Sequence, residues 1–229
     1  MPPALRIEDL SFRYDRGAAD AQPVVRIDRF ELGEGEFALL RGHSGSGKTT
    51  LLSLVAGLLE PTLGTVEISG QRVHALRGAA RDRFRGEHLG LVFQTFNLLH
   101  GFTALENVLA GMMFSRIPRV EHRPRALALL KRLGIDRIDA RPEQLSVGQQ
   151  QRVAVARAVA ARPALVLADE PTASLDPLNA DGALELIKEA CREADAALLC
   201  VSHDPTASSH FDRVEDLASL AGGAGVGAS

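Results

Sequence analysis

The chain of 229 residues has no tryptophan, one tyrosine and two cysteines. Two cysteines exclude a disulfide framework and suit a reducing compartment. Because Cys191 and Cys200 lie in segments of apolar periodicity, we expect both to be buried structural thiols. Uninterrupted apolar runs, such as Ala196–Val201, are far shorter than the roughly 20 residues that cross a bilayer. No basic-then-apolar secretory leader is expected either, so a membrane role would need a partner.

The chain has little net charge. The formal net charge is −3, with 24% charged and 45% hydrophobic residues. These values are typical of a globular protein with a real core, and they argue against one that coats nucleic acid. We therefore expect no nucleic-acid partner. Arg77, Arg81 and Arg85 share one helix face by their spacing, and we interpret this face as solvated.

Strands and helices alternate along most of the chain, which predicts an α/β protein. Strands are expected at Arg6–Tyr14, Val24–Leu32, Glu36–Leu40, Thr65–Ile68, Leu89–Phe93, Ala164–Ala168 and Ala197–Val201. Helices are expected at Lys48–Leu58, Leu76–Arg85 and Asn179–Glu193.

Between Thr95 and Ala161 the pattern indicates helices alone. Thr103 with Glu106 and Ser146 with Gln149 form capping boxes; further helices are expected at Pro124–Leu133, ended by Gly134, and at Val153–Ala161. We predict a discontinuous core of residues 1–94 and 162–220, a helical lobe of residues 95–161, and a disordered tail of residues 221–229.

A phosphate-binding loop lies between a predicted strand and a predicted helix. Its glycines let backbone N–H groups surround phosphate oxygens, and the helix start adds a positive dipole end. Lys48 supplies a charge to the β- and γ-phosphates, and the Thr49 hydroxyl can bind Mg²⁺. The alternative is an ordinary glycine turn. The ATP-binding residues expected here are Gly42, His43, Ser44, Gly45, Ser46, Gly47, Lys48, Thr49 and Thr50.

Two adjacent carboxylates follow the apolar strand that ends at Ala168. Asp169 is placed to hold Mg²⁺, and Glu170 to polarise the water that attacks the γ-phosphate. A solvated strand end is the alternative. None of the three lysines lies in a guanine-reading motif, which argues against a GTPase, whereas the loop alone leaves a small-molecule kinase open.

Further motifs indicate which class of nucleotide-binding protein this chain resembles. Leu145–Gln149, followed by Gln150, Gln151 and Arg152, resembles the signature loop of ATP-binding-cassette (ABC) ATPases. In the expected order, Gln94 resembles the Q-loop glutamine, Ser174, Leu175 and Asp176 resemble the D-loop, and His203 resembles the switch histidine. Tyr14 resembles the aromatic residue that stacks on adenine. Taken singly, Tyr14 could be a core residue, Gln94 a surface amide and His203 a satisfied histidine.

The resemblance covers roughly Ile7 to Leu217 and implies a P-loop NTPase (RecA-like) core with an antiparallel β subdomain and an inserted α-helical subdomain. It implies ATP hydrolysis with Mg²⁺ held by Thr49, Gln94 and Asp169, and catalysis by Glu170, His203 and Gln94. It also implies a head-to-tail homodimer, in which Ser146, Val147, Gly148 and Gln149 act on the ATP of the opposite protomer.

The segments Phe93–Leu99 and Thr103–Val108 are similar to the ATPases of lipoprotein-release and macrolide-export systems. This similarity implies a membrane permease contacted near Gln94–Phe102, and a location on the cytoplasmic face of the inner membrane. A cell-division cassette, or a soluble cassette ATPase with a non-transport partner, remains the alternative.

Two positions depart from the family pattern. Val147 stands where a glycine is usual in the signature loop, and a β-branched residue disfavours positive φ, so strain is expected if the loop needs that conformation. His43 stands where proline or asparagine is common, at a position expected to face outward.

Overall fold

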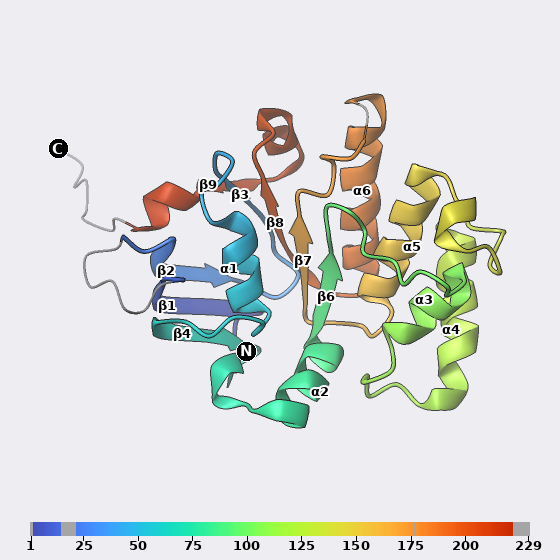
Figure 1. Cartoon of the computed structure of the whole chain (residues 1–229), viewed down its shortest axis with the longest axis horizontal. Coiled ribbons are helices and arrows are strands. Elements are labelled where there is room, and N and C mark those ends of the chain that lie inside the picture. Colours follow the sequence, from blue (N-terminus) through green and yellow to red (C-terminus); the bar gives the residue numbers. More distant parts are fainter. Residues whose placement is uncertain (1, 15–21, 176, 222–229) are drawn as a thin grey trace.

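The computed structural model describes residues 2–14, 22–175 and 177–221. Of the disordered tail expected at residues 221–229, Ala221 is instead the last residue of a 3₁₀ turn, and residues 222–229 lie outside the described residues. The chain forms two sheets and a group of helices (Figure 1). The strands are β1 (Leu5–Phe12), β2 (Val25–Leu32), β3 (Phe37–Arg41), β4 (Leu63–Ile68), β5 (Gln71–Arg72), β6 (Leu89–Val92), β7 (Leu165–Asp169), β8 (Ala197–Ser202) and β9 (Arg213–Asp216). The helices are α1 (Lys48–Val55), α2 (Gly78–His88), α3 (Ala104–Ala110), α4 (Arg119–Arg132), α5 (Val147–Val159) and α6 (Pro177–Glu193), with 3₁₀ turns η1 (Val73–Ala75), η2 (Pro142–Gln144), η3 (Pro205–His210) and η4 (Leu217–Ala221).

A parallel sheet of order β6-β7-β8-β3-β9 forms the centre of the molecule. Alternate residues of a strand point to opposite faces: Val166 and Ala168 of β7 join the hydrophobic cluster with α3 to α6, whereas Leu165 and Leu167 join the cluster with α1. Both faces are therefore covered. This explains why these strands are continuous apolar runs in the sequence, and it confirms the α/β prediction.

The second sheet is antiparallel, with order β2-β1-β4-β5. Its register shifts between Glu8 and Ser11 of β1, where Asp9 has a φ of 48°. Gly64 of β4 crosses this bulge with a φ of 85°, and a Cβ there would overlap the Asp9 carbonyl. Glycine is thus required where β4 passes the β1 bulge.

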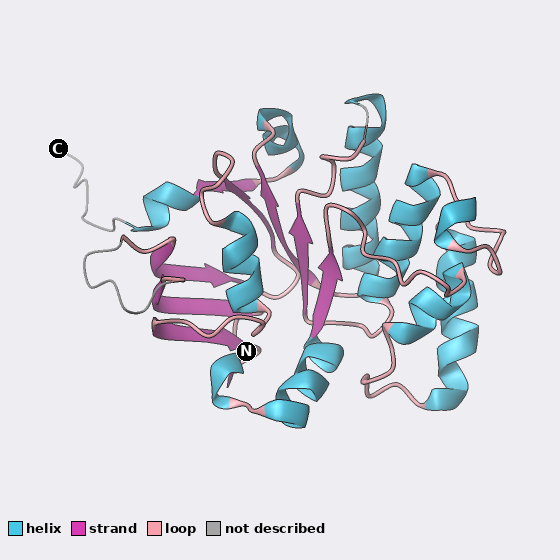
Figure 2. Cartoon of the chain, viewed as in Figure 1, coloured by secondary structure: helices cyan, strands magenta, loops and turns pink. Residues whose placement is uncertain are grey.

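Residues 95–161 contain helices and loops only, on the side of the parallel sheet away from the antiparallel one (Figure 2). Both capping boxes predicted from the sequence are present. Two predicted starts are wrong: α5 begins at Val147, directly after its Ser146 cap, and α4 begins at Arg119 with Pro124 inside it. Pro118, with a φ of −56° and a ψ of 138°, directly precedes the helix, so α4 begins before the predicted start at Pro124.

The interpretation of Arg81 and Arg85 as solvated is also wrong. The Arg81 side chain is 13% exposed and donates to the Leu76 carbonyl, and both guanidinium groups reach the Gly57 carbonyl just beyond the end of α1. They cap backbone acceptors that the helix leaves free. Cys191 and Cys200 are buried as predicted, and burial raises the pKa of the Cys191 thiol to about 12.

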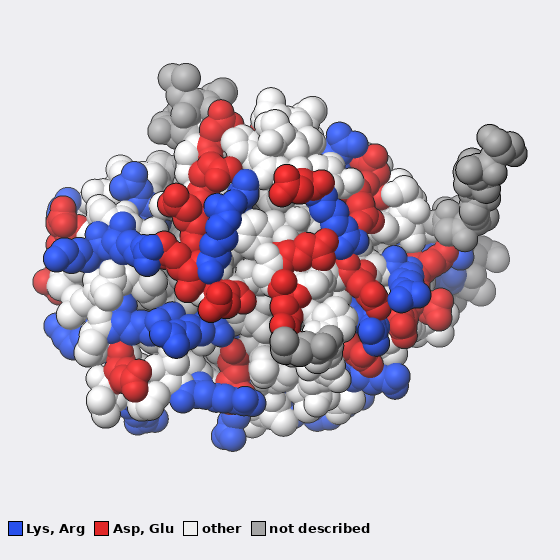
Figure 3. Space-filling model, turned by 180° about the vertical axis from the view of Figure 1, so that it is seen from behind, with Lys and Arg blue, Asp and Glu red and all other residues white. Residues whose placement is uncertain are grey.

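Charges of both signs alternate over the face turned away from the view of Figure 1 (Figure 3). No helix among the described residues is both long enough and apolar enough to cross a membrane.

We predict that Gly64→Ala destabilises the fold more than Gly35→Ala. Both glycines have positive φ, but the space around Gly35 is open. Gly35→Ala should therefore cost only the left-handed penalty of about 1–2 kcal/mol, while Gly64→Ala adds overlap with the Asp9 backbone. Urea unfolding midpoints measure the difference; equal losses would contradict the account of the bulge.

Candidate nucleotide site

The candidate site lies at the carboxyl ends of the parallel strands, where ligands bind in open α/β sheets. Strand β3 leads into the glycine-rich loop, β7 ends at Asp169, and β8 ends at Ser202. Since β3 and β7 both pair with β8 in parallel, these three ends meet on one edge. The structure thereby brings the loop, the carboxylates and His203 together.

The glycine-rich loop leads directly into helix α1. Gly47 is the residue before the helix, with a φ of 89°, and a Cβ there would lie 2.6 Å from the Val24 carbonyl. Lys48 begins the helix, and its side chain is 6% exposed; Nζ donates to the carbonyls of Gly42 (2.7 Å) and His43 (3.0 Å). The His43 side chain is exposed, as expected for an outward position.

Glu170 is the centre of the polar cluster at this edge. Its Oε1 lies 3.2 Å from Lys48 Nζ and 2.9 Å from His203 Nδ1. Its Oε2 accepts from the Ser202 hydroxyl and the His203 backbone N–H, both at 3.1 Å. Burial alone would raise the pKa of this carboxyl, but the bonds from His203 and Lys48 outweigh it and hold the pKa below its ordinary value. Glu170 is thus ionised at neutral pH.

Asp169 behaves differently. Burial and the nearby negative charge of Glu170 raise its pKa, against the lowering contributions of the Thr49 hydroxyl and Lys48. Its Oδ1 is buried and has no hydrogen-bond partner among the described residues. A carboxylate oxygen without a partner beside a hydroxyl is the donor set that Mg²⁺ prefers, so Asp169 and Thr49 fit the metal expected there.

Tyr14 is not a core residue. Its side chain is 67% exposed, its ring meets the Phe12 ring edge-on at 4.9 Å, and its hydroxyl lies 3.0 Å from Thr50 Oγ1. The core alternative is therefore wrong. Thr50 is buried and uses its hydroxyl on Tyr14, which fixes the tyrosine relative to the phosphate loop.

Gln94 is exposed two residues after β6. Its carbonyl accepts from the Ser174 hydroxyl at 3.0 Å, so the segment after Glu170 is attached to this loop. Leu175 donates its N–H to the Thr172 carbonyl. Asp176 lies outside the described residues.

The signature residues lie apart from this cluster: α5, which they begin, and α1 lie on opposite sides of β6 and β7 (Figure 1). Ser146 caps α5 by accepting from the Gln149 N–H, and Ser146, Val147 and Gly148 are exposed. Val147 is not among the described residues with positive φ. As the first helical residue it needs no left-handed conformation, so the expected strain is absent.

Sequence reasoning missed Ser202 and Gln151. Ser202 donates to Glu170, and its place as the last residue of β8, directly before His203, was the available signal. Gln151 is 3% exposed and donates to the carbonyl of Pro171, one residue after Glu170. In the sequence it was recognised only as part of the run that follows the signature loop.

Comparison with known proteins agrees with this geometry. Residues 25–173 match the family model described as ABC transporter. The lipoprotein-releasing system ATP-binding protein LolD 1 of Caulobacter vibrioides is 49% identical, over 83% of this chain and 82% of its own length. LolD of Pseudomonas fluorescens is 42% identical over 92% of each chain.

Solved structures show the same fold. The ATP-binding cassette MJ0796, as a dimer bound to ADP and Pi after hydrolysis, is 34% identical with a TM-score of 0.79 over 93% of each chain. The structure of cbiO1 from Clostridium perfringens, part of the ABC transporter complex cbiONQ, is 27% identical with a TM-score of 0.81, over 94% of this chain and 85% of its own. The chain belongs to the ABC transporter family, as an ATP-binding cassette with ATPase activity.

Proposed function

We propose that this ATPase drives an exporter or extruder of the lipoprotein-release type, working with a separate permease at the cytoplasmic face of the inner membrane. The LolD relatives support the type of system. The observation that carries the ATPase role is the ionised Glu170 carboxylate, held between Lys48 and His203 at the phosphate loop.

In this proposal Glu170 acts as the general base. A carboxylate with a lowered pKa is ready to accept a hydrogen bond from the attacking water and orient it toward the γ-phosphate. Lys48 supplies positive charge to the transferred phosphoryl group, and His203, which is 55% exposed and contacts Glu170, contacts the same phosphate. Mg²⁺ on Asp169 and Thr49 would neutralise phosphate charge when bound.

The opposite protomer completes the site. The exposed start of α5 presents free backbone N–H groups and a positive dipole end, but not to its own phosphate loop. A head-to-tail dimer would place these groups on the partner's ATP. ATP would then hold the dimer closed, and hydrolysis would remove that contact.

The permease would dock in a groove of about 480 Å³ between α2 and the helices of residues 95–161. It is lined among others by Leu58, Phe93, Asn97, Phe114 and Arg157. Leu58 and Phe114 are more than half exposed, and the nearby Leu99 and Phe102 add apolar surface. Exposed apolar groups of this size are typical of a partner contact.

The alternative is a cell-division-type cassette with a non-transport partner. Purification of the chain from detergent-solubilised membranes separates the two: a co-purifying permease supports the exporter, and a cell-wall regulator or division protein supports the alternative.

We predict that Glu170→Gln lowers ATP hydrolysis by about 10²-fold or more, the range for loss of a general base. ATP binding should survive, because the phosphate loop, Thr49 and Asp169 are intact. With ATP the variant should elute as a closed dimer in size-exclusion chromatography, while the nucleotide-free wild type elutes as a monomer.

Glu185→Gln is the matched control. Glu185 also lies between a lysine and a histidine, with Lys188 Nζ at 2.8 Å and His210 Nδ1 at 3.3 Å, but on α6. Hydrolysis should be normal in this variant. A normal rate in Glu170→Gln would show that Glu170 is not the base.

We predict that Tyr14→Ala weakens ATP binding by about 1–3 kcal/mol, the loss of one base-stacking contact. Tyr14→Phe removes only the bond to Thr50 and should bind nearly as wild type does. Titration with a fluorescent ATP analogue measures both. If the two variants weaken binding equally, the hydroxyl and not the ring is responsible.

We predict that Val147→Gly leaves the ATPase rate unchanged, because Val147 already has an ordinary backbone conformation. A slightly lower melting temperature is expected, since glycine disfavours a helix. Steady-state phosphate release measures the rate, and a clear increase would reveal strain that the fold does not show.

A further inference from the structure

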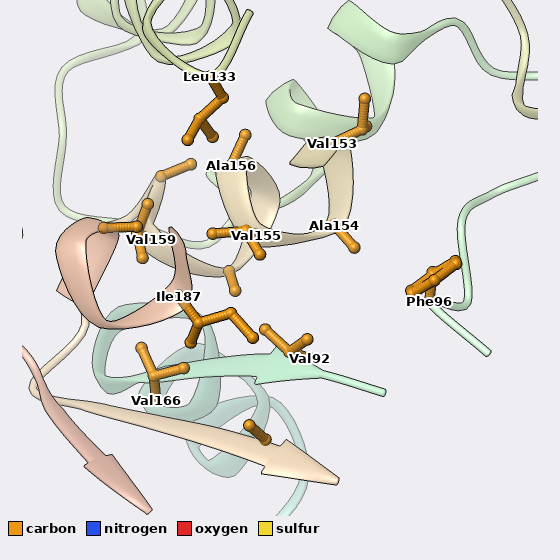
Figure 4. Packing of buried hydrophobic residues seen from close by; sticks show 14 of the residues in the cluster. Val92, Phe96, Leu133, Val153, Ala154, Val155, Ala156, Val159, Val166 and Ile187 are labelled. Atoms are coloured by element: carbon orange, nitrogen blue, oxygen red, sulfur yellow. The ribbon is translucent and has the colours of Figure 1, made fainter. Parts of the chain in front are cut away.

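The loop from Gln94 to Leu99 connects β6 of the core with the helices of residues 95–161. Two consecutive residues in it, Phe96 and Asn97, have φ angles of 60° and 44°. A left-handed conformation is unfavourable for the bulky side chain of Phe96 and persists only where the surroundings hold it, whereas asparagine adopts it more readily. Phe96 is buried in the same hydrophobic cluster as Val153 and Ala156 of α5, and Figure 4 shows it on the loop facing that cluster.

Arg157 of α5 holds this conformation. Its guanidinium donates to the carbonyl of Asn97 and to the carbonyl of Phe96, both at 2.6 Å. Burial lowers the pKa of this guanidinium, so a partly buried charge is satisfied here by backbone carbonyls.

The packing around Arg157 leaves it little freedom. A Cβ on Gly111, at the end of α3, would lie 2.5 Å from the Arg157 carbonyl and 3.0 Å from its Cγ. The end of α3 therefore rests directly on the Arg157 backbone and stem.

The other end of the loop is held by the core. The Ser174 hydroxyl donates to the carbonyl of Gln94, and Ser174 follows Glu170 by four residues. Thr95 is thus the one residue between a core attachment at Gln94 and a helical attachment at Phe96.

We propose that Arg157 is a positioning residue for Gln94, which makes the loop move with α5. This inference rests on the proposed function, in which the start of α5 contacts the partner's ATP, and on the family resemblance, which implies that Gln94 is a Mg²⁺ ligand. A shift of α5 would be carried by Arg157 to Phe96 and Asn97, and across Thr95 to Gln94. Arg157 also lines the permease groove, so a docked permease would act on the same loop.

The planar guanidinium matters, because its two donors point at two adjacent carbonyls in a fixed geometry. Lysine has the charge but no such fork. In Arg157→Lys we expect kcat for ATP with Mg²⁺ to fall at least about tenfold, the scale of a small misplacement in an active site. KM should not change, because Tyr14 and the phosphate loop are untouched. Hydrogen–deuterium exchange should increase within residues 94–99.

Arg125→Lys is the matched control. Arg125 also donates to two consecutive backbone carbonyls, those of Val159 and Ala160 at the far end of α5. Its replacement should lower the melting temperature to a similar degree, yet leave kcat and exchange at residues 94–99 as in the wild type. Arg157→Gln, which keeps one donor group, replaces Arg157→Lys if the latter fails to fold.

The proposal is overturned if the Arg157 variant keeps the kcat of the Arg125 control, or if exchange at residues 94–99 does not rise. A rise in hydrogen–deuterium exchange spread over the whole chain, rather than confined to residues 94–99, would also overturn it. Failure of the proposed function is distinguishable: a wild type that does not hydrolyse ATP would refute the ATPase assignment, whereas the exchange measurement would still report on the loop.

Discussion

The carboxylate of Glu170 is the constraint on which the rest of the site depends. A buried carboxylate is tolerated only when charged and hydrogen-bonding partners surround it. Those partners come from the loop after β3 and from the end of β8, so the register of three parallel strands has to bring Lys48, Ser202 and His203 to one point. The lowered pKa of Glu170 makes this arrangement stabilising above the unfolded value of 4.5, and the contribution is lost as pH falls through the lower folded value. Asp169, whose pKa is raised, contributes in the opposite sense.

Residues with a strained backbone lie next to the polar cluster around Glu170. Glu170 has a φ of 46°, and its backbone is held by the Val201 carbonyl on the neighbouring strand. Phe96 and Asn97 are held by Arg157. Both strained segments follow a strand of the parallel sheet, and the Ser174 hydroxyl joins them through Gln94. The sheet is the rigid support, and the strained turns are fixed by side chains from elements that approach it from either side. A displacement of α5 relative to the sheet therefore acts first on these turns.

Much of the fold could be predicted because apolar runs and caps are local signals. The parallel strands were recognised from continuous apolar segments, and Ser146 with Gln149 identified the start of a helix. Errors arose where tertiary contacts decide: Arg81 has the sequence pattern of a solvated residue, but the end of α1 lies within its reach. Strand β9 was missed because Arg213–Asp216 is polar and is a strand only beside β3. The residues of the site followed from motifs, whereas the contacts of Ser202, Gln151 and Arg157 join distant segments and leave no spacing pattern in the sequence.

The proposed function uses two surfaces of the chain that do not meet. One is the polar cluster around Glu170 at the sheet edge, and the other is the exposed start of α5. Two contacts nevertheless connect them: α5 reaches the turn after Glu170 through the buried Gln151 and the Gln94 loop through Arg157. If the start of α5 binds the nucleotide of a second copy, the same helix transmits that event to the catalytic turn of its own chain. The two nucleotide sites of such a pair would then be mechanically linked through each chain's core, and a permease docked in the groove lined by Arg157 would join the same linkage.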